Sequence, residues 1–179
     1  MKRIVLGVAA AAATLAGPAA QAATKTCLTP AEMNGLVTYF LPQVIDGVVE
    51  TCSPHLPEDS YLRTGLTVRA DELRGRADAV WPLARAGFIK IGSGKNPGDA
   101  AAMLALSDDE LREKIDVGFV ETLGIDLKPG GCADVNDISE TLASLSAAQM
   151  VEFVAVTFAA VSRGDKRMAS CPRAQGNAG

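Results

Sequence analysis

The sequence has one histidine, His55, and aromatic residues make up only 4% of it. A single histidine excludes a zinc site built from three histidines. So few aromatic rings leave little surface on which the bases of single-stranded nucleic acid could stack. The net charge of −4 also disfavours contact with a phosphate backbone. We therefore expect neither a histidine-rich metal centre nor a nucleic-acid partner.

The sequence also lacks a complete phosphate-binding motif. Gly94-Lys95 resembles the end of a P-loop, but the glycine required five residues before Gly94 is replaced by Ile89. The Ser or Thr that would hold magnesium after Lys95 is replaced by Asn96. We therefore interpret the glycine-rich segment Gly92–Gly98 as a surface loop.

Other motifs for chemistry are incomplete or missing as well. The acidic run that begins at Asp134 resembles a calcium loop, but Ile138 stands where an oxygen ligand is required. The G-x-S-x-G nucleophile elbow of many hydrolases does not occur. The sequence therefore predicts no metal and no cofactor.

The N-terminus is typical of a secretory signal. Lys2-Arg3 give a positive start, Ile4–Ala16 form an apolar run, and Ala20-Gln21-Ala22 supply the small residues of a cleavage site. The apolar run is shorter than the ~20 residues that a spanning helix needs. We therefore expect residues 1–22 to be removed and the protein to reach the bacterial periplasm or the extracellular medium, with no membrane span after cleavage.

The rest of the chain, residues 23–179, is expected to form one domain. A chain of this length can bury a core of its own. No long Gly/Ser or Pro linker divides it, and no internal repeat is present. Residues 172–179 are predicted to be a disordered tail.

Helix start signals are the strongest local pattern. Three capping boxes pair a Ser or Thr with a Glu or Gln three residues later: Thr29 with Glu32, Ser107 with Glu110, and Ser146 with Gln149. Apolar residues follow each box at helical spacing. These patterns predict helices over about 30–52, 107–123 and 146–163. The last of them is apolar nearly all round, which predicts a position at the centre of a bundle.

Weaker patterns predict helices over 70–86, 99–106 and 137–145. The period-2 alternation of a strand is scarce and is limited to Phe88–Ile91. The predicted fold is therefore all-α, a single compact bundle of five or six helices with two disulfide bridges.

The four cysteines contain no C-x-x-C pair, which favours disulfides over a zinc or thioredoxin-type site in a secreted chain. They are Cys27, Cys52, Cys132 and Cys171. A straight helix between Cys27 and Cys52 would be ~33 Å long at 1.5 Å per residue. A disulfide requires Cα atoms within about 7 Å. These two cysteines could therefore pair only if Pro42 folded the helix back on itself.

An up-and-down arrangement of the helices ranks the other two pairings. With Cys27 and Cys52 at opposite ends of the first helix, alternating helix directions bring Cys132 to the end of Cys52 and Cys171 to the end of Cys27. This arrangement favours Cys52–Cys132 with Cys27–Cys171. The alternative, Cys27–Cys132 with Cys52–Cys171, remains open.

Charge is spread unevenly along the chain. Residues 60–95 are rich in bases and residues 99–126 are rich in acids. The two regions could simply be solvated faces that attract each other, or the first could be a patch for an anionic partner. The candidate residues for such a patch are Arg63, Arg69, Arg74 and Arg76.

These patterns favour a non-enzymatic binding or interaction domain, whose partner is an unknown protein or small ligand. One alternative is a carrier of a small apolar ligand, with the apolar final helix lining its cavity. The other is a hydrolase in which His55 acts as general base with an acid from elsewhere in the chain. A polar loop residue after a helix end would explain His55 equally well.

Overall fold

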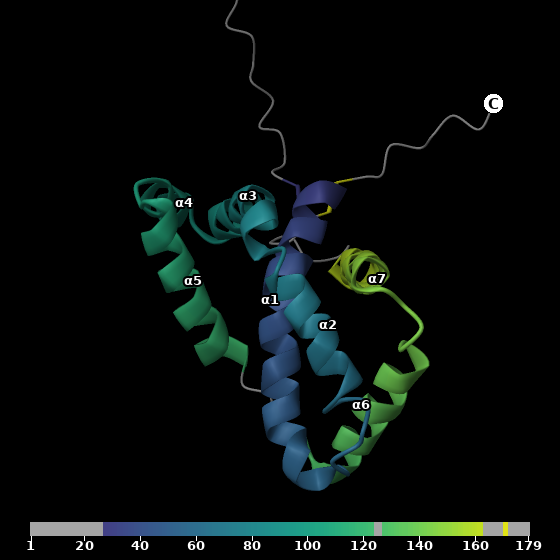
Figure 1. Cartoon of the computed structure of the whole chain (residues 1–179). Coiled ribbons are helices and arrows are strands. Elements are labelled where there is room, and N and C mark those ends of the chain that lie inside the picture. Colours follow the sequence, from purple (N-terminus) through teal and green to yellow (C-terminus); the bar gives the residue numbers. More distant parts are fainter. Residues whose placement is uncertain (1–26, 124–126, 163–169, 172–179) are drawn as a thin grey trace, which may run out of the picture.

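The computed structural model of the protein describes residues 27–123, 127–162 and 170–171 (Figure 1). Its helices are α1 (Pro30–Cys52), the 3-10 turn η1 (Ser53–His55), α2 (Gly65–Arg74), α3 (Ala77–Lys95), α4 (Pro97–Leu104), α5 (Asp108–Leu123), α6 (Pro129–Thr141) and α7 (Ala147–Val161). Over these ranges the only β-type pairing is an isolated bridge between Leu28 and Ser170. The all-α prediction with two disulfides is confirmed, with seven α-helices rather than five or six.

The predicted capping boxes form. At the start of α1, the Thr29 hydroxyl accepts a hydrogen bond from the Glu32 backbone N–H at 3.2 Å, and the Glu32 carboxylate accepts one from the Thr29 backbone N–H at 2.8 Å. The same reciprocal bonds start α5 and α7. Each box satisfies two N–H groups that would otherwise lack a partner, and so fixes where the helix begins.

The extra helix comes from a break that the sequence analysis did not place. The single helix predicted over 70–86 is two helices, because α2 ends at Gly75. The Gly75 backbone N–H donates to the Asp71 and Leu73 carbonyls, which closes the last turn. The α3 helix then starts at Ala77 and continues past Pro82.

The prediction of a surface loop over residues 92–98 is wrong. The α3 helix continues to Lys95, and a single residue, Asn96, separates it from α4. The Asn96 side chain accepts a hydrogen bond from the Gly98 backbone N–H at 3.0 Å, so it caps α4. The polar residues of this segment thus mark a junction between two helices. The short strand pattern at Phe88–Ile91 lies inside α3.

The start of α6 also differs from the prediction. The helix begins at Pro129 and includes Asp137, which was expected at its beginning. Proline suits the first helical position because its missing N–H would have no partner there. Farther along α6, the Asn136 side chain accepts a hydrogen bond from the Leu62 backbone N–H at 3.1 Å. This bond ties α6 to the segment that precedes α2.

The central helix is α1, not α7. Figure 1 shows α1 as the axis of the molecule, and it contacts α2, α3, α5 and α7. The α7 helix buries one side, which includes Val151 and Ala155, against the rest of the protein. On its other side Phe153 is 50% exposed, and Val161, the last residue of the helix, is 77% exposed. The apolar composition of α7 therefore predicted the wrong central helix, because the longer helix α1 occupies the centre.

Two glycines allow close packing of α1 against α3. A Cβ atom added at Gly35 would lie 2.7 Å from the Leu83 Cβ, and one added at Gly87 would lie 2.7 Å from the Leu36 Cδ1. Both distances are shorter than a van der Waals contact between carbon atoms. A larger residue at Gly35 would also meet the backbone of α3, since the Ala84 N lies 3.0 Å away from the added Cβ, so the two helices would have to separate. At Gly87 the Leu36 side chain would have to move.

The disulfides are Cys27–Cys171, with a Cα–Cα distance of 4.9 Å, and Cys52–Cys132, with 5.3 Å. This is the pairing that the up-and-down arrangement favoured. The α1 helix runs through Pro42 without a break, so Cys27 and Cys52 stay at opposite ends. Within the described ranges, no helix is long and apolar enough to cross a membrane.

The bridge between Cys52 and Cys132 is expected to be a major source of stability. Both cysteines are fully buried, and the bridge closes a separation of 80 residues. The double variant Cys52→Ala/Cys132→Ala should lose about 2–4 kcal/mol of unfolding free energy. Urea denaturation measures this loss. A variant as stable as the native protein would contradict the prediction.

Candidate functional site

An apolar groove of about 290 Å³ lies between α1 and the helices α3, α5 and α7. Every residue that lines it is apolar. The lining residues are Leu28, Met33, Leu36, Val37, Phe40, Leu41, Val44, Phe88, Ile91, Phe119, Val154 and Phe158. We call this cavity the apolar groove.

The groove lining follows from the helical periodicity of α1. Six of its lining residues belong to the apolar stripe of α1 that the sequence assigned to the core. The centre of the lining is aromatic, since the ring of Phe40 lies 4.3 Å from that of Phe119 and 6.2 Å from that of Phe88, measured between centroids. Rings from three helices therefore meet at this point, at distances typical of stabilising aromatic pairs.

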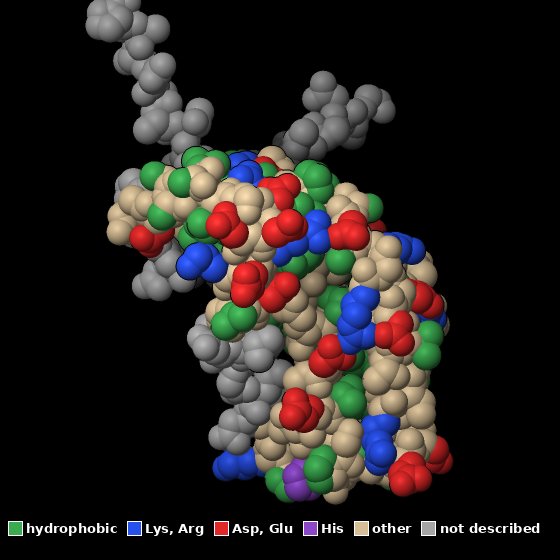
Figure 2. All heavy atoms as spheres, turned by 60° about the vertical axis from the view of Figure 1, so that its left-hand side comes forward, with side chains coloured by type: hydrophobic (Ala, Val, Ile, Leu, Met, Phe, Trp, Pro, Cys, Tyr) green, Lys and Arg blue, Asp and Glu red, His purple; other side chains and the backbone are tan. Residues whose placement is uncertain are grey.

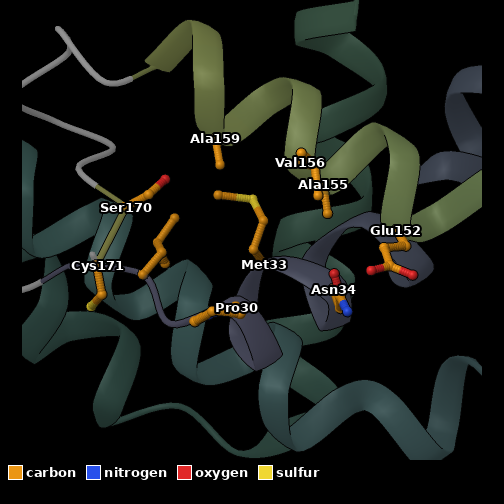
Figure 3. Close-up of a pocket in the computed structure, with 10 residues that line it drawn as sticks. Pro30, Met33, Asn34, Glu152, Ala155, Val156, Ala159, Ser170 and Cys171 are labelled. Carbon is orange, nitrogen blue, oxygen red and sulfur yellow. The ribbon is translucent and has the colours of Figure 1, made fainter. Parts of the chain in front are cut away.

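A second cavity of about 420 Å³ adjoins the groove and is partly polar, and we call it the polar pocket. It shares Leu28 and Met33 with the groove. Its polar side chains are Asn34 on α1, Glu152 on α7 and Ser170 in the segment that the Cys27–Cys171 disulfide holds. Figure 3 shows Met33 in the middle of this polar pocket, with Ser170 on one side and Asn34 and Glu152 on the other.

Ser170 carries a buried hydroxyl beside this cavity. Its Oγ is inaccessible to solvent and has no hydrogen-bond partner among the described residues. Burial of a hydroxyl without a partner costs free energy. Because the atom is inaccessible from the cavity, Ser170 contributes no polar surface to a ligand there.

A buried ion pair lies beside the Leu28 end of the groove. The Lys90 Nζ lies 2.7 Å from the Glu32 carboxylate and donates to the Cys27 carbonyl at 3.2 Å. Burial opposes the ionisation of Glu32, but the hydrogen bonds from Lys90 and Thr29 outweigh it and lower the pKa of Glu32. The charge of Lys90 is thus balanced by Glu32. The ion pair and the bond to Cys27 connect α3 to the start of α1.

A polar cluster joins α5 to α1 and α3. Asp116 accepts hydrogen bonds from the Tyr39 hydroxyl at 3.3 Å and from the Gln43 amide at 3.1 Å. The Arg112 guanidinium lies 4.5 Å from the centre of the Trp81 ring, at cation–π distance. Burial, followed by the nearby charge of Asp116, raises the pKa of Tyr39 to about 12. A phenol with this pKa is protonated at neutral pH, as its hydrogen bond to Asp116 requires.

The structure places His55 away from both cavities. His55 is exposed in η1, after the end of α1, and lines neither the apolar groove nor the polar pocket. Over the described ranges, no group of three or more His, Cys, Asp or Glu side chains could hold a metal ion. Among the described residues no hydrogen bond or ion pair joins the His55 side chain to a partner, and its role as a general base stays a prediction.

The four arginines of the predicted anionic patch differ in their contacts. Arg69 pairs with Glu72 at 2.9 Å, and Arg74 pairs with both Asp46 and Asp71. Arg63 donates to the Leu56 carbonyl at 3.3 Å, while Arg76 is exposed. Acidic and basic side chains are interspersed on the face shown in Figure 2. An anionic partner at this patch stays a prediction, and it would compete with these carboxylates.

Two ion pairs join α3 and α5. Arg85, a base of the basic region on α3, lies 2.9 Å from Asp108, an acid of the acidic region on α5. The second pair has the opposite arrangement, because Arg112 on α5 lies 2.6 Å from Asp78 on α3. Of these two pairs, the first is the one expected if the basic and acidic regions attract each other.

The sequence analysis did not identify Asn34, Glu152 or Ser170. One available signal was Cys171, because its bridge to Cys27 brings Ser170 next to the start of α1. Glu152 gave no signal of its own, since it resembles any solvated residue of a helix. Comparison with protein-family models, curated proteins and solved structures finds no match to the chain.

The raised pKa of Tyr39 predicts a loss of stability at high pH. Because the folded state keeps the phenol protonated, this contribution is fully present below about pH 10 and is lost as the pH rises towards about 12. The variant Tyr39→Phe should therefore show a smaller decline in unfolding free energy over that range, as measured by urea denaturation. Tyr61→Phe is the control, and equal declines in all three proteins would contradict the prediction.

Proposed function

We propose that the protein is a non-enzymatic binding protein of the periplasm or the extracellular medium, and that the apolar groove holds its ligand. The observation that carries this proposal is the lining of the groove, which consists of apolar residues alone. Apolar surface left in water costs about 25 cal/mol per Å². A ligand that covers the groove would recover that free energy.

The size of the groove supports a small apolar ligand. Its volume of about 290 Å³ is near the lower end of the ~300–1,000 Å³ that is common for small-molecule sites. An α-helix of a partner protein has a diameter of roughly 10–12 Å and would not fit inside it. The carrier form of the binding hypothesis is therefore favoured.

A protein partner is the second candidate function, and the outer side of α7 favours it. Phe153 and Val156 lie three residues apart on this helix and are exposed, and Val156 also lines the polar pocket. Contiguous exposed apolar residues often mark a protein–protein contact.

Secretion is supported by the two disulfides, because such bridges persist in oxidising compartments. If residues 1–22 are a signal, the protein exported from a bacterial host should begin at Ala23. Intact-mass measurement of the purified protein tests this. A mass that still includes residues 1–22 would contradict the proposed export.

The binding proposal predicts a single site for an apolar probe such as the fluorescent dye N-phenyl-1-naphthylamine. Val154 lines the groove and is only partly buried, so Val154→Asp places a carboxylate there without removing a core residue. An unpaired carboxylate disfavours an apolar neighbour. The affinity measured by fluorescence titration should fall by about tenfold or more.

Val68→Asp is the matched control, because Val68 is also on a helix but is 55% exposed and lines neither cavity. It should bind the probe like the native protein. Circular dichroism should show that both variants keep their helices. Failure of the native protein to bind, or equal affinities of the two variants, would overturn the proposal.

A further inference from the structure

The apolar groove and the polar pocket are joined. They share Leu28 and Met33, and the buried Ala155 of α7 also lines the pocket. Met33 belongs to both cavities, and its side chain is flexible and unbranched. A single ligand could therefore occupy both cavities, with an apolar part in the groove and a polar part in the pocket.

The polar pocket favours a cation. Glu152 is the one ionisable residue in its lining, and it is exposed. Neither cavity includes a Lys or Arg in its described lining. The nearby Lys90 is balanced by Glu32 at 2.7 Å and is therefore not available to bind an anion. Among the described lining residues, Glu152 would repel a negative head group.

The polar pocket also favours a group that donates hydrogen bonds. The carboxylate oxygens of Glu152 and the amide oxygen of Asn34 can accept such bonds, and the two side chains lie on the same side of the pocket (Figure 3). A primary ammonium group carries three donors and one positive charge, so it matches this set of acceptors.

We infer that the ligand is a cationic amphiphile, with one aliphatic chain in the apolar groove and an ammonium head group in the polar pocket near Glu152 and Asn34, which lie on the same side of Met33 (Figure 3). This inference rests on the proposed binding function and adds the chemistry of the head group. It also assigns Glu152 as the residue that selects the charge of the ligand.

Three probes of equal chain length test the inference: decylammonium, decanoate and decanol. Each is titrated against the N-phenyl-1-naphthylamine complex of the full mature protein, below its critical micelle concentration. Decylammonium should displace the dye at the lowest concentration, and decanoate at the highest. The preference for decylammonium should weaken as salt is added, because an exposed ion pair is screened.

The variant Glu152→Gln keeps the size of the side chain and removes its charge. It should weaken decylammonium binding by about threefold, as expected for an exposed ion pair, and leave decanol binding unchanged. Glu50→Gln is the matched control, because Glu50 is an exposed glutamate of α1 that lines neither cavity. It should bind all three probes like the native protein.

The outcomes separate the inference from the proposed function. Equal affinities for the three probes, tighter binding of decanoate, or no specific effect of Glu152→Gln would overturn the cationic head group while leaving the groove as an apolar binding site. Absence of binding by the dye and by all three probes would overturn both proposals.

Discussion

The arrangement depends on α1, which is fixed at both ends by disulfides and along its length by close helix contacts. Cys27 lies just before its capping residue and is bridged to Cys171, while Cys52 is its last residue and is bridged to Cys132. The bridges bring the segment after α7 to one end of α1 and the start of α6 to the other. With these distant segments fixed in place, the other helices pack around a rigid axis.

The groove results from two contacts that hold α3 and α7 against α1. On the α3 side, Gly35 and Gly87 let the helix backbones approach closely. On the α7 side, Ala155 is a small buried residue that packs against Met33 and Leu36. At other positions of α1 the side chains are larger, and these side chains line the apolar groove between α1 and the neighbouring helices. The binding hypothesis thus depends on packing that local sequence patterns do not encode.

Much of the fold could be predicted from local signals. The three capping boxes were recognisable because a cap is a short-range hydrogen-bond pattern of fixed spacing. The length of one helix and the assumed alternation of the others favoured the observed disulfide pairing but left the pairing Cys27–Cys132 with Cys52–Cys171 open. The break at Gly75 was missed although the hydrogen bond that closes α2 there is local. The continuation of α3 to Lys95 was missed because its glycine-rich end is typical of a loop, and the contact with α4 is not visible in a local pattern. An added Cβ at Gly92, for example, would lie 2.8 Å from the Met103 Cε on α4.

By itself, the sequence determined the all-α class, the start of three helices and the residues of the two bridges, because capping, periodicity and chain length are local properties. Only the tertiary structure decided that α1 rather than α7 is central, and that Glu152 and Ser170 share one pocket. The physical reason is that burial depends on which faces meet. A glutamate of α7 and a serine beside Cys171 are distant along the chain, and they become neighbours only after a disulfide and a helix crossing bring their segments together.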